Sequence, residues 1–347
     1  MSDFELVAGF EDVWRPPVDA RARRPTPVLG RAATAMAVRS KLARVVARTP
    51  EVMVRVTGRT RDARHLAAHL SYITRKGELP AEGRDGLDIR GAREVSEVAE
   101  DWSITAELDS RRRVSTPFSV SIILSMPADT DAVRLRDAAR AFAAGQFGDR
   151  HDYLFALHTD TRHPHVHLTV RALGDHAERL NPKKADLEAW RQMFAEALRE
   201  RGIAAEATPR RARGVTRKAE RMPVRKVMDL YAAGRGPAPA VLKSALAEAV
   251  RLASGSDAGT TEWERAIAVR QARIRATWLA QARLLQAAPD PLDRQLGAQV
   301  EQFVRDMPAP VSRRLSLARQ FRARETGHDR GAGREGRPEG PARGRDR

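Results

Sequence analysis

The sequence LHTDTRHPHVHLTV, residues 157–170, holds four of the nine histidines of the chain within ten positions. His165 and His167 flank Val166 in a run typical of a β-strand, where side chains two residues apart point to the same face. The six residues from Thr159 to Pro164 can form a turn that joins this strand to the preceding one as an antiparallel hairpin. Such a hairpin brings His158 opposite the other two histidines, so that three imidazoles converge.

Three imidazoles on adjacent strands can hold one metal ion and leave positions open to water or phosphate oxygens. We expect His158, His165 and His167 to be the ligands, whereas His163 lies in the turn. We expect Asp160 to accept a hydrogen bond from the second nitrogen of a ligand, or to act as a base. Imidazole favours borderline ions, so ligand chemistry indicates Mn²⁺, with Mg²⁺ binding through phosphate and water oxygens.

The segments around this stretch alternate between strand and helix patterns. Strand patterns cover residues 52–58, 117–126, 152–158 and 165–171, and helical spacing covers residues 65–73, 131–147 and 186–201. We therefore predict an α+β fold, with a central antiparallel sheet flanked by helices, over residues 51–226.

The rest of the chain differs in composition. Residues 1–50 are rich in Arg, Pro and Ala with little periodicity, and we expect a basic, partly disordered arm. From about Ala240 the chain carries Ala, Leu, Arg and Gln in long helical patterns, which predicts a helical C-terminal region over residues 227–322. Residues 323–347 are rich in glycine without apolar periodicity, so we expect a disordered tail.

The surplus positive charge is concentrated in two stretches. Lys and Arg outnumber Asp and Glu by 62 to 45, a formal net charge of +17. Residues 15–48 contribute a net +8 and residues 208–226 a net +7. Such clusters are typical of segments that neutralise phosphates, and the alternative interpretation is a solvated face. The second cluster supplies the candidate DNA-binding residues Arg210, Arg211, Arg213, Arg217 and Lys218.

Composition excludes several classes of protein. The chain has no Cys, which excludes disulfides, thiolate nucleophiles and Cys-ligated zinc. No stretch approaches the ~20 apolar residues of a membrane span, and the N-terminus lacks a signal-peptide pattern. We therefore expect a soluble, cytoplasmic protein whose macromolecular partner is a polyanion.

The histidine stretch resembles the third motif of the relaxases, the mobilisation nucleases of the HUH endonuclease superfamily. Upstream, HLSYITRKGEL (residues 69–79) resembles the first motif of the branch that contains the T-DNA border endonuclease. SVSIILSMPADTD (residues 119–131) resembles its second motif. The similarity spans roughly residues 52–226 and implies the palm of an HUH relaxase.

Relaxases nick one strand of plasmid DNA at a transfer origin and stay attached to the 5′ end through a phosphotyrosine. The resemblance implies Tyr72 as the nucleophile, Asp160 as the acidic residue of the third motif, and a Mg²⁺ or Mn²⁺ ion. It implies that the ligands of this ion are His158, His165 and His167. It also implies single-stranded or locally melted DNA as substrate. Relaxosome accessory proteins and a conjugative secretion coupling protein are the implied partners, with export alongside the DNA.

The residues themselves favour Tyr72 among only three tyrosines. Tyr153 lies in an apolar strand and Tyr231 beyond the motifs. Tyr72 lies in a predicted helix, and Arg75 and Lys76 follow it, where they can hold a phosphate. A phenol with a pKa near ~10 is a poor nucleophile at neutral pH, and a metal that polarises the scissile phosphate supplies the needed help. The alternative is a half-buried Tyr that packs a helix.

One residue departs from the relaxase pattern, and other functions stay open. Four residues after the last histidine the branch commonly has Asn, whereas this chain has Arg171, a change that alters substrate contact or marks altered activity. The alternatives are a rolling-circle replication initiator or transposase, a catalytically inactive DNA-binding accessory protein, and a structural metal protein. No G-x-x-x-x-G-K-[ST] loop supports an initiator helicase, and a structural metal site has no use for Tyr72.

Overall fold

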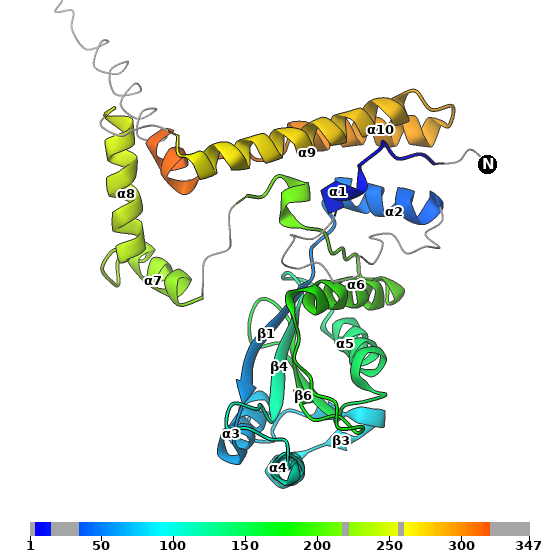
Figure 1. Ribbon diagram of the computed structural model, residues 1–347, viewed down its shortest axis with the longest axis vertical. Coiled ribbons are helices and arrows are strands. Elements are labelled where there is room, and N and C mark those ends of the chain that lie inside the picture. Colours follow the sequence, from blue (N-terminus) through cyan, green and yellow to red (C-terminus); the bar gives the residue numbers. More distant parts are fainter. Residues whose placement is uncertain (1–3, 15–34, 217–221, 256–259, 320–347) are drawn as a thin grey trace, which may run out of the picture. The chain divides into compact units, whose positions relative to one another are not determined.

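The histidine stretch forms a β-hairpin in the middle of a sheet, as the sequence predicts (Figure 1). Strand β5 (Tyr153–His158) pairs with strand β6 (His165–Arg171) in antiparallel register. In this register His158 lies directly opposite His165. The intervening turn therefore returns the chain so that the first histidine of the stretch faces the second strand.

The computed structural model describes residues 4–14, 35–216, 222–255 and 260–319. They belong to two compact units, one from Met1–Pro209 and Gln281–Phe303, the other from Arg210–Ala280 and Val304–Arg347. Arg217 and Lys218, and the predicted tail over residues 323–347, lie outside the described residues. No helix within the described ranges combines the length and apolar content needed to cross a membrane.

Among the described residues the sheet has six strands, all antiparallel, in the order β1-β4-β6-β5-β2-β3. The strands outside the hairpin are β1 (Met53–Thr60), β2 (Ala81–Gly83), β3 (Asp88–Ile89) and β4 (Ser119–Ser125), and the 3-10 helix η2 (Arg84–Gly86) separates β2 from β3. Strand β4 is buried along almost its whole length, which explains its continuous apolar run. In β1 the register shifts between Val56 and Gly58, so the strand contains a β-bulge.

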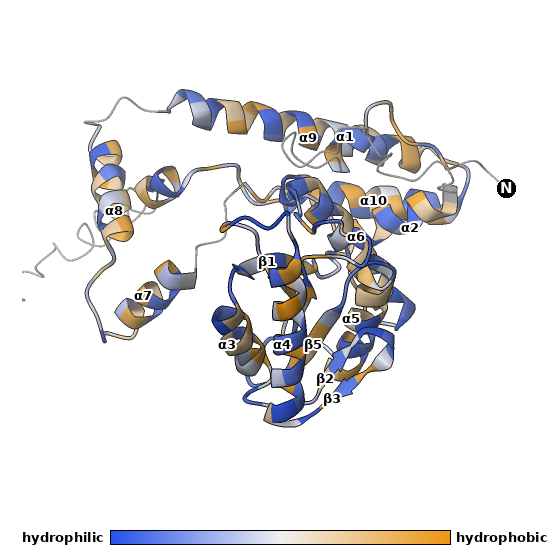
Figure 2. Cartoon of the chain, turned by 60° about the horizontal axis from the view of Figure 1, so that its bottom comes forward, coloured by the Kyte–Doolittle hydropathy of each residue, from blue (hydrophilic) through white to orange (hydrophobic). Residues whose placement is uncertain are grey.

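Helices cover both faces of the sheet (Figure 1). The helices of one face are α5 (Ala132–Phe147) and α6 (Lys184–Glu200), and those of the other are α3 (Ala63–Ile73) and α4 (Gly91–Leu108). Val166, Leu168 and Val170 of β6 pack in the core cluster with α5 and α6. Because side chains alternate along a strand, His165 and His167 point to the face that carries α3. Figure 2 shows hydrophobic and hydrophilic residues mixed along α4, as in an amphipathic helix.

The larger core cluster rests on aromatic side chains from the two helices α5 and α6. The ring centroids of Phe142 and Phe194 lie 5.9 Å apart, and those of Phe147 and Trp190 lie 5.4 Å apart. Burial of a large apolar side chain contributes about 1.5–3 kcal/mol relative to exposure. The α5–α6 layer therefore fixes the strands that carry the histidines.

Part of residues 1–50, the stretch predicted to be a basic, partly disordered arm, is folded. Beyond the short helix α1 (Glu11–Trp14), helix α2 (Ala35–Val46) buries Leu42 and Val45 completely. Lys41 and Arg44 form ion pairs with Glu206, whose side chain is 1% exposed. These two cations neutralise a buried carboxylate, a partner that the charge pattern of the arm does not reveal.

The C-terminal region is helical, as predicted. Its helices are α7 (Met222–Ala232), α8 (Ala240–Ala253), α9 (Glu262–Gln286) and α10 (Pro291–Arg305). The 3-10 helix η3 (Arg210–Arg213) belongs to the second unit and is hydrogen-bonded to α9. Trp278 Nε1 donates to the carbonyl of Ala212 at 3.0 Å, and Gln271 Nε2 donates to that of Arg211 at 3.3 Å.

Candidate metal centre

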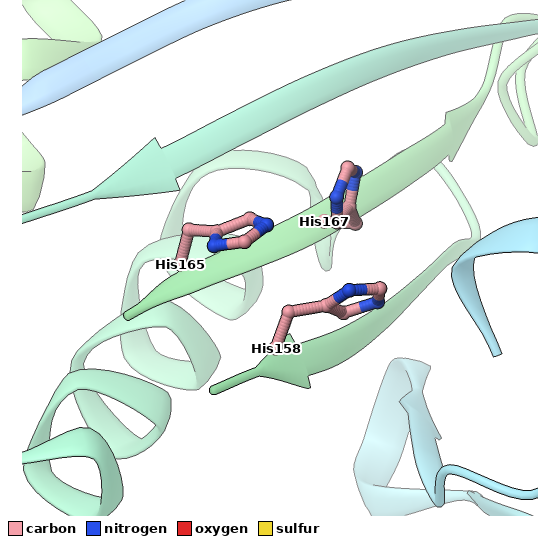
Figure 3. A group of neighbouring side chains, drawn as sticks. All are labelled: His158, His165 and His167. Carbon is pink, nitrogen blue, oxygen red and sulfur yellow. The ribbon is translucent and has the colours of Figure 1, made fainter. Parts of the chain in front are cut away.

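Three imidazoles meet on the α3 side of the sheet (Figure 3). His158 comes from the end of β5, and His165 and His167 come from β6. The ring centroids lie 4.5 Å apart for His158 and His167, 5.1 Å for His165 and His167, and 5.3 Å for His158 and His165. One nitrogen from each ring lies within 4.8 Å of the other two. The structure thus brings together the three histidines that the sequence predicts as ligands.

The hydrogen bonds of two of these rings decide which nitrogen can bind a metal. His158 Nε2 lies 2.7 Å from the carbonyl oxygen of Ile73, and His165 Nδ1 lies 3.0 Å from that of His163. A carbonyl oxygen only accepts, so both of these nitrogens carry hydrogen and donate. The lone pairs of His158 Nδ1 and His165 Nε2 are left for an ion, and the set fits a divalent transition metal.

The electrostatics of the cluster favour the neutral form of His158 and of His167. Burial lowers the pKa of His158 and, reinforced by the two neighbouring imidazoles, lowers the pKa of His167 to about 3. A ring with a pKa this low is unprotonated at neutral pH, and only an unprotonated nitrogen binds a metal ion.

Tyr72 stands beside the three histidines, at the last turn of α3. Its ring meets that of His167 edge-on, with centroids 6.1 Å apart and planes at 86°, and the residue is 69% exposed. Asp62 is the N-cap of this helix, and its side chain accepts a hydrogen bond from the backbone N–H of His65 at 2.7 Å. Leu66, Leu70 and Ile73 are the fully buried positions of α3, and this leaves Tyr72 on a different stripe of the helix, as the spacing predicts.

Asp160 and Arg75 form an ion pair next to the cluster. The guanidinium of Arg75 donates to Asp160 Oδ2, and Asp160 Oδ1 lies 3.8 Å from His158 Nδ1. The hydrogen bond from Arg75 is the largest cause that lowers the pKa of Asp160. Arg75 and Lys76 follow α3 with positive φ angles of 50° and 58°, so the chain turns sharply after the helix and presents both exposed cations.

Asp160 does not accept a hydrogen bond from the second nitrogen of His158 or of His165, as the sequence suggests it could. Backbone carbonyls accept from those two nitrogens instead. The carboxylate lies instead on the side of His158 Nδ1, the nitrogen with the free lone pair. Sequence gives no signal for a backbone carbonyl, because every residue carries one.

Arg171, the departure from the relaxase pattern, lies at the far end of β6. Its Nη2 forms ion pairs with Asp152 and Asp175, each at 2.8 Å. Six residues separate it from His165, which is about 20 Å along an extended strand. This arginine holds the strand end to two carboxylates and does not reach the histidines.

His69 contributes a contact that the sequence analysis missed. Its Nε2 lies 2.8 Å from Ser121 Oγ on β4 and 3.0 Å from Thr169 Oγ1 on β6. Burial lowers the pKa of this histidine, so the ring is neutral at pH 7. Its spacing three residues before Tyr72 is visible in the sequence, but the strand residues that face it depend on the register of the sheet.

The predicted phosphate-binding arginines of η3 belong to the second unit. Arg210 is exposed, whereas Arg211 and Arg213 are partly buried. The electrostatic interpretation therefore applies most directly to Arg210, since a buried guanidinium is less accessible to a phosphate.

Comparison with known proteins finds a match within the first unit. Residues 72–203 match the family model described as relaxase, MobA/VirD2-like, nuclease domain. These residues are similar to the nuclease domains of MobA/VirD2-like relaxases. The matched range contains Tyr72 and the three clustered histidines.

The chain also resembles curated proteins. The chain is 31% identical over 205 residues to the T-DNA border endonuclease VirD2 of Rhizobium radiobacter, with 51% of this chain and 48% of that protein covered. It is 32% identical over 187 residues to the protein of the same name from Agrobacterium fabrum (strain C58), with 48% and 42% covered. The chain therefore spans about half the length of the curated relatives it matches. A solved chain from "Molecular Basis of Vancomycin Resistance Transfer in Staphylococcus aureus" is 12% identical at a TM-score of 0.33, with 46% of this chain and 99% of that chain covered.

Proposed function

We propose that this protein is a site- and strand-specific relaxase that nicks DNA at a transfer origin, with Tyr72 as the nucleophile. The observation that supports this most strongly is the position of the Tyr72 ring against His167. A phenol that is exposed to solvent and lies beside a cluster of three imidazoles is suited to attack a phosphate bound at that cluster. The match to T-DNA border endonucleases points to DNA as the substrate class.

The residues that would hold a divalent ion are His158, His165 and His167. Bound there, the ion would polarise a scissile phosphate and stabilise negative charge on its non-bridging oxygens. Three imidazole ligands favour Mn²⁺, and Mg²⁺ fits if phosphate and water oxygens complete its coordination.

Tyr72 Oη forms the new bond to phosphorus, and the bond from phosphorus to the 3′ oxygen breaks. The phenol loses its proton to solvent, and the 3′ oxygen leaves as a hydroxyl after taking up a proton. The product is a 5′-phosphotyrosyl diester, so attack by a 3′ hydroxyl reverses the reaction without ATP. This suits an enzyme that cuts a strand, remains attached during transfer and rejoins it.

Arg75 and Lys76 are placed to bind the phosphates next to the scissile one, because both are exposed at the end of α3. Asp160 is a weak proton acceptor, since its pKa is lowered by Arg75. Its role in the proposed reaction is to orient the guanidinium of Arg75 and to add negative charge beside His158. The clustered arginines, including Arg210, would contact DNA outside the nick site.

The test is an assay of strand cleavage on supercoiled DNA. A plasmid that carries the intergenic DNA upstream of the gene for this chain is incubated with the purified protein and Mn²⁺ or Mg²⁺. We expect a nicked circle with protein covalently bound at the 5′ end, and no nick in the same plasmid without that insert. A protein that binds Mn²⁺ and the insert but leaves the circle intact would contradict the proposal and favour an inactive DNA-binding accessory protein.

A further inference from the structure

We propose that His69 is a positioning residue that fixes helix α3 on the sheet so that the Tyr72 ring stands beside His167. The proposal deepens the function proposed above, since it concerns the placement of the same nucleophile. It assigns His69 no contact with the metal or with the reacting phosphate.

One ring nitrogen of His69 bridges the adjacent strands β4 and β6. Nε2 lies within hydrogen-bond distance of Ser121 Oγ and Thr169 Oγ1, at 2.8 Å and 3.0 Å. Ser121 and Thr169 are paired directly opposite each other in the β4–β6 register, and they are 4% and 0% exposed. Each hydroxyl can donate or accept, so a bond to His69 forms in either tautomer of the ring. Both hydroxyls are shielded from water, which makes their loss of a partner costly.

A second anchor lies on the other side of Tyr72. The carbonyl of Ile73 accepts the hydrogen bond from His158 Nε2 at 2.7 Å, which ties the end of α3 to a histidine of the cluster. Tyr72 thus lies between a residue bonded to β4 and β6 and a residue bonded to β5. Since the Tyr72 side chain is 69% exposed, its own packing contributes little to its position.

The orientation of a nucleophile has a large effect on rate. A displacement of about 1 Å at a distance from the reacting atoms can reduce a rate about 100-fold. Without the hydrogen bonds from His69 to Ser121 and Thr169, the last turn of α3 would still be held by the hydrogen bond at Ile73 and by the apolar contacts of the helix. This turn could then rotate about those remaining contacts. The placement of Tyr72 would then vary, while the three histidines would stay in position on their strands.

Two substitutions separate positioning from packing. His69→Leu keeps the apolar volume and removes the hydrogen bonds, whereas His69→Gln places a side-chain amide near the position of Nε2. We expect His69→Leu to slow the single-turnover formation of the covalent adduct about 10- to 100-fold, with unchanged affinity for Mn²⁺ and for the same nick-site oligonucleotide. His69→Gln should restore the rate to within about threefold. His65→Leu, an exposed position one turn earlier on α3, is the matched control and should keep the wild-type rate.

A second measurement does not depend on cleavage. The chain has three tyrosines, so labelling with [ε-¹³C]tyrosine gives three signals, and Tyr72→Phe identifies one of them. We expect His69→Leu to shift or broaden the Tyr72 signal, and His69→Gln to leave it in place. If the wild-type protein forms no adduct, the proposed function fails, but this signal still decides the role of His69.

A variant with Ser121→Ala and Thr169→Val removes both hydroxyls without touching α3, and serves if His69→Leu fails to fold. It should change the Tyr72 signal and the rate in the same direction. The proposal would be overturned by a Tyr72 signal that neither variant moves. It would also be overturned if His69→Gln reduced the rate as much as His69→Leu at an equal melting temperature.

Discussion

The ring of Tyr72 on α3 meets the ring of His167 on β6 edge-on, at 6.1 Å between centroids. The two residues come from distant parts of the chain, one from a helix and one from a strand. Their contact depends on the buried stripe of α3, which packs one side of the helix and leaves Tyr72 on another side, beside His167. The proposed chemistry depends on this contact, because an exposed tyrosine elsewhere would have no phosphate to attack.

His165→Ala should weaken Mn²⁺ binding, because it removes one of the three proposed imidazole ligands. Removal of a residue that hydrogen-bonds a metal ligand typically reduces metal affinity about 10- to 100-fold. We expect His165→Ala, which removes a ligand itself, to reduce the affinity for Mn²⁺ by more than this. Isothermal titration with Mn²⁺ alone measures it. His163→Ala is the matched control, since the backbone carbonyl that accepts from His165 Nδ1 is retained. Equal affinities for the two variants would contradict the ligand assignment.

Asp160→Asn should reduce the nicking rate with little change in melting temperature. The ion pair with Arg75 is exposed on both sides, and exposed pairs contribute little to stability. Asp88→Asn is the control, because Asp88 forms a similar exposed pair with Arg90 away from the histidines. Equal nicking rates for both variants and the wild-type protein would show that Asp160 has no part in the reaction.

Arg210→Gln should flatten the dependence of DNA affinity on salt. If Arg210 neutralises one phosphate, the slope of log K against log salt falls by about 0.7–0.9. Fluorescence anisotropy at several salt concentrations gives the slope. Arg235→Gln, an exposed position of the same unit outside the cluster, should leave it unchanged. An unaltered slope for Arg210→Gln would place this residue in solvent.

The buried carboxylate of Glu264 predicts a pH dependence of stability. The hydrogen bond from Arg314, followed by those from Ser312 and Thr261, lowers the pKa of Glu264 to about 2. A depressed folded-state pKa means that the stabilisation is complete above the ordinary pKa of a glutamate and is lost as the pH falls toward 2. We expect about 2–3 kcal/mol from this group at pH 7.

Glu264→Gln should therefore lower the melting temperature at pH 7 much more than at pH 3. Glu262→Gln, an exposed neighbour, should change it little at either pH. A melting-temperature difference between Glu264→Gln and wild type that stays constant with pH would contradict the assignment.

Strands and helices that have a clear hydrophobic periodicity could be predicted from the sequence. The hairpin, β4, α5 and α6 each show their own periodicity, and the structure places them within a few residues of the predicted bounds. Strands β2 and β3 are too short to show a period. Helix α4 was missed because small residues, Ala99, Ser103 and Ala106, occupy many of its buried positions and weaken its hydropathy pattern.

Part of the candidate site could likewise be predicted from local sequence, whereas the rest depends on contacts between distant segments. The three histidines lie within ten positions, so their convergence follows from a single turn. The partner of His158 is a backbone carbonyl of α3, and the partners of His69 depend on how β4 pairs with β6. The role of α2 was missed for a similar reason, because Glu206, the partner of Lys41 and Arg44, lies far along the chain.

The most direct test of the central claim is the covalent adduct of Tyr72→Phe on the plasmid that the wild-type protein nicks. Tyr231→Phe, also an exposed tyrosine, serves as the control. We predict that Tyr72→Phe binds the DNA with wild-type affinity and forms no SDS-resistant protein–DNA adduct, whereas Tyr231→Phe forms it normally. An adduct of normal yield with Tyr72→Phe would show that another residue attacks the phosphate.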